Sequence, residues 1–127
     1  MTEPSIYDRI GGEPGVRRLV AAFYAEMDTN PHAAGIRAMH HGDLQQIQEK
    51  LFEFLSGWFG GPSLYIEKYG HPRMRARHLP FQIGISEMEQ WLLCMSVALD
   101  ETVADGQLRS DLFGAFARFA DHMRNVE

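Results

Sequence analysis

Cysteine is nearly missing from this chain: Cys94 is the single one among 127 residues. One cysteine excludes an internal disulfide and any zinc site built on cysteine pairs. Cys94 itself stands in an apolar stretch, residues 91–95, where a thiol usually serves as a small hydrophobic side chain. We therefore expect no catalytic role for it.

A positive net charge and long hydrophobic runs are also absent. Lys and Arg number 12 against 17 Asp and Glu, so the formal net charge is -5. This balance excludes a general nucleic-acid binder, because phosphate contacts need a basic surface. No apolar run approaches the roughly 20 residues that cross a bilayer, and residues 1–8 lack the basic and apolar regions of a signal peptide. We expect a cytoplasmic protein without membrane or nucleic-acid partners.

Strand patterns are scarce too, whereas helical periodicity is strong. Apolar residues recur at three- and four-residue spacing in four long segments, residues 14–27, 44–59, 87–103 and 107–124. A chain of this length has room for one hydrophobic core. The sequence predicts a single all-α domain over residues 1–127, with its core at about residues 6–123.

Helix-start signals refine two of these segments. Asp43 with Gln46, and Ser86 with Glu89, have the spacing of capping boxes. In a capping box, two side chains satisfy backbone N–H groups at the start of a helix. We expect helices to begin directly after Asp43 and Ser86.

Residues 63–85 break the helical pattern, because glycines and prolines interrupt them. This irregular segment holds three arginines, Arg73, Arg75 and Arg77, next to His78. An imidazole beside guanidinium groups suits haem, whose iron binds imidazole and whose propionates pair with arginine. The alternative is a solvated basic turn with a surface histidine, and the rest of the chain has to decide between the two.

Five motifs occur in order between Ile6 and Met123. They are Tyr7-Asp8-x-x-Gly11-Gly12, Phe23-Tyr24, Phe54-Leu55-x-x-Trp58-x-Gly60-Gly61-Pro62, Gly70-His71-Pro72-x-x-Arg75-x-Arg77-His78 and Trp91-Leu92-x-Cys94-Met95. Together they resemble the truncated haemoglobins of group II. The resemblance implies a truncated globin with haem b as its cofactor. Its four long helices would form a two-over-two sandwich, with an irregular loop near residues 70–77 in place of most of the proximal helix.

On the proximal side, the resemblance assigns His78 as the ligand of the iron, which leaves the opposite face open to a gas. Arg77 matches a residue that pairs with a haem propionate, and a guanidinium–carboxylate pair would fix the orientation of the haem. Arg75, Lys50 and Tyr65 are further candidates for this rim. For each of them, a solvated surface position is the alternative.

On the distal side, the resemblance places Tyr24 and Trp91 as hydrogen-bond donors to a bound ligand, with an ordinary core position as the alternative for both. His40 is the expected third polar group, although a one-residue shift would put Met39 there. Many relatives have Tyr or Phe at this position followed by Pro, whereas this chain continues with His41. The identity of the third distal group therefore stays open.

Apolar residues complete the implied pocket. Ile47 and Leu51 fall where the distal helix faces the iron. Many members have a smaller residue at the position of Ile47, so we expect the isoleucine to narrow the route by which a ligand enters. Phe81 and Met95, together with Ile83, are expected against the porphyrin. Phe54, Leu55 and Trp58 lie further along the apolar face of the same predicted helix, residues 44–59, and we expect them to pack in the core.

Three functions follow from these assignments. The first is a haem protein that binds dioxygen, nitric oxide or carbon monoxide at a five-coordinate iron, and whose polar distal pocket favours scavenging or redox chemistry over bulk oxygen transport. The second is a haem enzyme, a nitric oxide dioxygenase or a peroxidase-like catalyst that acts on peroxide and takes electrons from an unknown external reductase. The third is a non-haem helical interaction module, or a metal site at His40, His41 and Asp43. A monomer and a homodimer both stay open.

Overall fold

The computed structural model describes residues 3–40 and 43–126, and all regular structure within them is helical. The elements in chain order are α1 (Ile6–Ile10), α2 (Gly12–Thr29), the 3-10 helix η1 (Pro31–Ala33), α3 (Ala34–Ala38), α4 (Leu44–Trp58), α5 (Leu64–Tyr69), α6 (Met74–His78), α7 (Ile85–Thr102) and α8 (Gly106–Met123). None of these described helices has the length and apolar character needed to cross a membrane.

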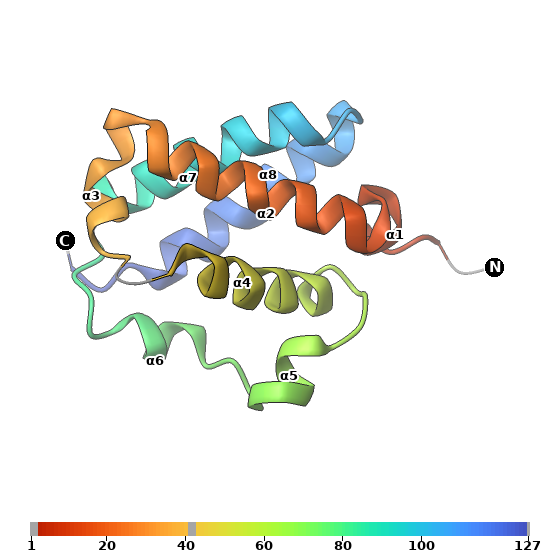
Figure 1. Cartoon of the computed structure of the whole chain (residues 1–127), viewed down its shortest axis with the longest axis horizontal. Helices are drawn as coiled ribbons and strands as arrows, with labels where there is room; N and C mark the ends of the chain where they lie inside the picture. Colours follow the sequence, from red (N-terminus) through yellow and green to blue (C-terminus); the bar gives the residue numbers. More distant parts are fainter. Residues whose placement is uncertain (1–2, 41–42, 127) are drawn as a thin grey trace.

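The four long helices form two layers, each an antiparallel pair (Figure 1). In one layer α2 packs on α4, and in the other α7 packs on α8. Across the layers, α2 packs on α7. The predicted all-α, two-over-two architecture is confirmed, and each predicted end of the four long helices lies within two residues of the observed end.

The core lies between the two layers. On α2, the side chains of Val16, Leu19 and Phe23 are at most 1% exposed, at the spacing that forms one apolar face of a helix. Met95 and Cys94 on α7 belong to the same cluster and are fully buried. Burial raises the pKa of the Cys94 thiol to about 11, so the thiol is neutral at ordinary pH and acts as a hydrophobic side chain.

Both ends of α4 differ in part from the prediction. Asp43 caps the start, as expected, but its carboxylate accepts a hydrogen bond from the Gln45 N–H at 2.9 Å rather than forming a reciprocal box with Gln46. Near the other end Leu55 is 1% exposed and packs in the core. Trp58, however, is 40% exposed, so the prediction of core packing is wrong for this residue.

The start of α7 also differs from the prediction. Its N-cap is Gly84, and the Glu87 carboxylate accepts a hydrogen bond from the Gly84 N–H at 2.8 Å. The Ser86 hydroxyl accepts instead from the side-chain amide of Gln90, at 3.0 Å. The predicted capping box of Ser86 with Glu89 is therefore wrong, because Glu87 fills the role of Glu89 two residues earlier.

The irregular middle segment contains two short helices, α5, which packs on α4, and α6, which packs on α8. Both lie below α4 in the view of Figure 1. Glu53 of α4 is 3% exposed, and its carboxylate lies 2.9 Å from the ammonium group of Lys68 and 3.3 Å from the donating hydroxyl of Tyr69. Both partners belong to α5, so these bonds tie α5 to α4. In the turn before α6, the Nδ1 atom of His71 accepts a hydrogen bond from the Arg73 N–H at 3.1 Å, which stabilises the turn.

Candidate functional site

A cavity of about 360 Å³ opens among α3, α4, α6, α7 and α8. This volume lies in the range of small-molecule sites. Six of the thirteen predicted site residues line it: His40, Ile47, His78, Phe81, Ile83 and Trp91. They come from segments far apart in the sequence, and the fold brings them to one place.

The other seven predicted residues are not part of the cavity lining. Tyr24 and Met95 are buried in the core, and Leu51 is half-buried against it. The remaining four are Lys50 on α4, Tyr65 on α5, and Arg75 and Arg77 on α6. Conversely, α7 and α8 bring Met88, Phe119 and Met123 to the cavity, and these were not predicted as site residues.

His78 stands at the end of α6 and is half-buried. Its Nδ1 atom lies 2.6 Å from the carbonyl oxygen of Met74, one helical turn earlier. A carbonyl can only accept, so Nδ1 must carry the hydrogen. In the neutral ring Nε2 is then left with a lone pair, which is the form that binds a metal.

His40 has the same arrangement. Its Nδ1 atom lies 2.7 Å from the carbonyl oxygen of Ile36, so this nitrogen also carries the hydrogen. The Nε2 atom of neutral His40 is therefore an acceptor, and only the protonated ring could donate from it to a ligand. His40 was expected as a third hydrogen-bond donor on the distal side, and in its neutral form it cannot fill that role. Met39 lines the cavity as well, so both residues of the one-residue alternative reach it.

Gln90 of α7 fixes the short helix that leads to His40. The Oε1 atom of Gln90 accepts a hydrogen bond from the Ile36 N–H at 3.0 Å. Gly35 makes this approach possible, because a Cβ atom there would lie 2.8 Å from that same oxygen. The position of α3 is thus set by a residue 54 positions later in the chain.

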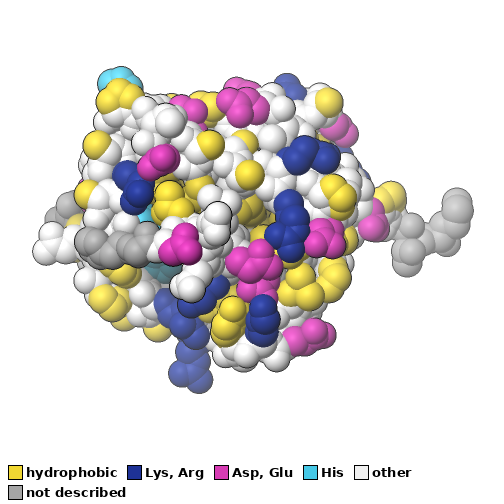
Figure 2. Space-filling view, viewed as in Figure 1, with side chains coloured by type: hydrophobic (Ala, Val, Ile, Leu, Met, Phe, Trp, Pro, Cys, Tyr) yellow, Lys and Arg dark blue, Asp and Glu magenta, His cyan; other side chains and the backbone are white. Residues whose placement is uncertain are grey.

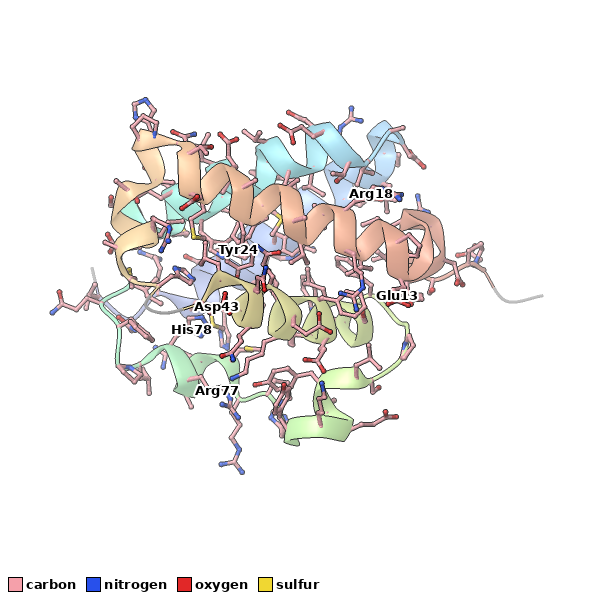
Figure 3. The ribbon with its side chains drawn as sticks, in the orientation of Figure 1. Glu13, Arg18, Tyr24, Asp43, Arg77 and His78 are labelled. Carbon is pink, nitrogen blue, oxygen red and sulfur yellow. The ribbon has the colours of Figure 1, made fainter. Side chains whose placement is uncertain are left out.

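Tyr24 projects from α2 and is 5% exposed. Its ring centroid lies 5.0 Å from that of Phe23 and 6.0 Å from that of His40, both in edge-to-face geometry. Burial raises the pKa of the phenol well above its usual value, so Tyr24 keeps its hydrogen across the physiological pH range. Figure 3 shows Tyr24 and His78 on opposite sides of the start of α4 in that view.

Trp91 forms part of the cavity wall and packs edge-on against Phe23, with ring centroids 5.2 Å apart. The indole nitrogen can only donate. Within residues 3–40 and 43–126, neither this N–H nor the Tyr24 hydroxyl forms a hydrogen bond. Two neutral donors are therefore available near the cavity.

The basic residues of α6 lie outside the cavity, where Figure 2 shows Lys and Arg side chains gathered at the lower left. The Nε atom of Arg77 donates to the carbonyl oxygen of Pro72 at 2.7 Å, and its guanidinium carbon lies 5.9 Å from the centre of the Tyr65 ring. The Lys50 ammonium group lies 5.5 Å from the centre of the Tyr69 ring. The outer N–H groups of Arg77 are left to pair with an anion.

Asn125 holds the segment that carries His78. Its side-chain amide donates to the carbonyl oxygens of His78 at 3.2 Å and of Phe81 at 2.8 Å, and its Oδ1 atom accepts from the Ile83 N–H at 2.9 Å. The Asn125 N–H donates in turn to the Ile83 carbonyl at 2.9 Å. Sequence reasoning missed Asn125, because no local pattern marks a partner 47 residues away.

Comparison with known proteins decides the family. Residues 5–125 match the family model described as bacterial-like globin. The chain belongs to the bacterial-like globin family. This globin is 39% identical to the group 2 truncated hemoglobin YjbI of Bacillus subtilis over 119 residues, which cover 94% of this chain and 87% of that protein.

Solved structures place the globin in the same group. It is similar to a cold-adapted truncated hemoglobin from Pseudoalteromonas haloplanktis, with a TM-score of 0.96, 40% identity and coverage of 98% of this chain and 100% of that one. It is also similar to the group II 2-on-2 hemoglobin of Agrobacterium tumefaciens, with a TM-score of 0.95 and 42% identity. This match covers 100% of this chain and 98% of that one. The expected kinship with group II truncated haemoglobins is confirmed.

The alternative metal site at His40, His41 and Asp43 falls partly outside the described residues, because His41 lies there. Within the part of the chain that the structure describes, no three His, Cys, Asp or Glu side chains come together as a metal site. The single histidine ligand that a haem iron needs does not depend on such a cluster.

Proposed function

We propose that this truncated globin binds haem b in the cavity and holds a diatomic ligand there, with His78 as the proximal ligand of the iron. The observation that carries the proposal is the 2.6 Å contact between His78 Nδ1 and the Met74 carbonyl, at a residue that lines the cavity. This contact fixes the ring orientation and leaves Nε2 as the metal-binding nitrogen. A carbonyl partner on the other ring nitrogen also raises the basicity of the ligand.

The surroundings of His78 suit haem as well. Ile47, Phe81 and Trp91 line the cavity with apolar surface, which an extended macrocycle needs. When bound, the haem supplies the iron at which dioxygen, nitric oxide or carbon monoxide is held. Arg77 would pair its outer N–H groups with a propionate, and Arg75, Lys50 and Tyr65 stay candidates for the same rim.

On the distal side, we infer that Tyr24 and Trp91 donate hydrogen bonds to the ligand. Both are neutral donors without a partner among the described residues. A hydrogen bond to a charged acceptor contributes roughly 1.5–3 kcal/mol, so two of them would slow dioxygen release by orders of magnitude. Slow release suits scavenging or redox chemistry rather than bulk transport.

Peroxide reduction is a second candidate function. A row of aromatic side chains, which connects the cavity wall to an exposed tryptophan, favours it. The nitric oxide dioxygenase reaction has no observation of this kind in its favour, and it stays a prediction from the sequence.

The test is reconstitution of the purified protein with haemin, followed by optical spectroscopy. Wild-type protein should develop a Soret band with one haem per chain. His78→Gly should lose stable haem binding, and added imidazole should restore it by replacing the missing ring. His71→Gln is the matched control, because His71 stabilises the neighbouring turn and does not line the cavity.

Two results would contradict the proposal. If wild-type protein gives no Soret band with haemin, the cavity does not bind haem. If His78→Gly has the wild-type spectrum without imidazole, another residue is the ligand. A loss of haem in His71→Gln as large as in His78→Gly would mean that the fold of the loop, and not the imidazole at position 78, is what matters.

A further inference from the structure

A row of aromatic rings connects the cavity to the protein surface. Trp91, in the cavity wall, has its ring centroid 5.6 Å from that of Phe116 and 6.3 Å from that of Phe119. The same two phenylalanines of α8 lie 5.3 Å and 5.5 Å from the ring of Trp58. Trp91 and Trp58 are thus separated by a single layer of phenylalanine rings in direct contact with both.

Trp58 is the surface end of this row. Its side chain is 40% exposed, although it stands on the apolar stripe of α4 and its ring also stacks on Phe54 at 6.2 Å. Packing on Phe116 alone requires only an apolar side chain of suitable size. An indole adds a property that phenylalanine lacks, because tryptophan gives up an electron far more readily. In this row the two tryptophans are therefore the oxidisable groups, and the phenylalanines form the bridge between them.

We propose that Trp58 is a surface oxidation site, which delivers electrons through Phe116 and Phe119 to Trp91 when a hydroperoxide is reduced in the cavity. The proposal rests on the proposed haem binding and extends it with a substrate class. The oxidant is a hydroperoxide, and the reductant is a phenol that is too large to enter a cavity of about 360 Å³. Such a phenol can still contact the exposed indole of Trp58.

The electrons and protons balance as follows. Reduction of a hydroperoxide breaks the O–O bond, takes up two electrons and two protons, and gives an alcohol and water. Trp58 supplies the electrons one at a time through Trp91, and each time it loses the proton of its indole nitrogen to solvent. A phenol then returns one electron and one proton to Trp58 and leaves as a phenoxyl radical. One hydroperoxide and two phenols thus give one alcohol, one water and two phenoxyl radicals.

Tyr69 offers an internal comparison. It is 42% exposed, similar to Trp58, and it packs on Tyr65 at 4.8 Å, which in turn contacts Phe54 at 6.2 Å. This second row is longer, and Phe54 contacts Trp58 and Phe119 rather than Trp91. The shorter row through Phe116 makes Trp58 the expected exit, and Tyr69→Phe the matched control.

The experiment uses haem-loaded protein, hydrogen peroxide and two phenols, one small and one tethered to a polymer that cannot enter the cavity. Trp58→Phe keeps an aromatic ring for packing but removes the oxidisable group, so oxidation of the tethered phenol should fall roughly tenfold or more. Trp58→Tyr should restore most of the rate, because tyrosine is also oxidisable. Tyr69→Phe should keep the wild-type rate, and the small phenol should be affected least.

A second measurement does not depend on turnover. With peroxide and no phenol, peptide mass spectrometry of the wild type should find oxidation products at Trp58 before Tyr69. Electron paramagnetic resonance should show a tryptophan radical whose signal becomes weaker in Trp58→Phe, where Trp91 is the one tryptophan left in the row. The proposal is overturned if Trp58→Phe oxidises the tethered phenol at the wild-type rate, or if Trp58 stays unmodified while peroxide is consumed. Absence of a Soret band before peroxide is added would overturn the proposed haem binding itself, which distinguishes the two failures.

Discussion

Replacing Gly35 by alanine should weaken the fold, although the same change usually strengthens a helix. The new Cβ atom would lie 2.8 Å and 2.9 Å from the oxygen and nitrogen of the Gln90 side-chain amide. That amide could move away only by giving up its hydrogen bonds with the Ile36 N–H and the Ser86 hydroxyl, both 3.0 Å long. The free-energy cost of the substitution is therefore the loss of these two hydrogen bonds.

The size of the effect follows from these two bonds. Each contributes roughly 0.5–1.5 kcal/mol to stability, and alanine returns at most about 1 kcal/mol of helix propensity over glycine. We expect Gly35→Ala to lower the free energy of unfolding by about 1 kcal/mol, since the two lost bonds together contribute roughly 2 kcal/mol and the helix propensity of alanine returns roughly 1 kcal/mol. Because Ile36 accepts the bond from His40, haem uptake by the variant should also slow.

Urea unfolding followed by circular dichroism measures the effect, in a double-mutant cycle with Gln90→Ala. In the Gln90→Ala background the three side-chain atoms nearest to the new methyl group are absent, so Gly35→Ala should become neutral or stabilising. Gly114→Ala in α8 is the control, because its Cβ atom would meet only the end of the Arg118 side chain, at 3.5 Å. If Gly35→Ala costs the same free energy with and without Gln90, the steric reasoning is refuted.

Two further predictions concern Tyr24 and Trp91. Burial raises the pKa of Tyr24, so the stability that this group contributes is complete below the pKa of an unfolded tyrosine, about 10, and is lost as the pH rises beyond it. Tyr24→Phe should therefore lose less unfolding free energy than the wild type between about pH 9 and about pH 11 in urea titrations, and parallel curves would contradict this. In haem-loaded protein, Tyr24→Phe and Trp91→Phe should each speed dioxygen release roughly ten- to a hundredfold, less than additively in the double variant, because both donors share one ligand. Stopped-flow measurement of the release rate decides it, and an unchanged rate in either variant would remove that residue from the list of donors.

The long helices could be predicted from the sequence because their apolar periodicity repeats over four or five turns, and the core enforces it. The start of α7 could not. Ser86 with Glu89 fits the capping pattern, but the reciprocal bond is made by Glu87 to the Gly84 N–H. Two overlapping patterns of similar local strength cannot be ranked without knowing that Ser86 is engaged with Gln90.

Some features of the candidate site could be predicted from the sequence, and others could not. His78 and Trp91 were predicted from motifs, and Phe81 from the pocket that the resemblance implies, and all three line the cavity. The orientation of His40 was not predictable, because it depends on which ring nitrogen bonds to the Ile36 carbonyl. The positions of Lys50 and Arg77 depend on aromatic rings of α5, and these contacts arise only when α5 folds back on α4.

The four hydrogen bonds of Asn125 have a consequence for the timing of cofactor capture. His78 precedes Asn125 by 47 residues, so the ribosome releases His78 well before the residue that anchors its backbone. Until residue 125 has emerged, the loop lacks its anchors at His78, Phe81 and Ile83. On the proposed haem binding, stable haem uptake therefore requires that residue 125 has already left the ribosome, and a change that keeps Asn125 from these three partners also delays the assembly of the binding site.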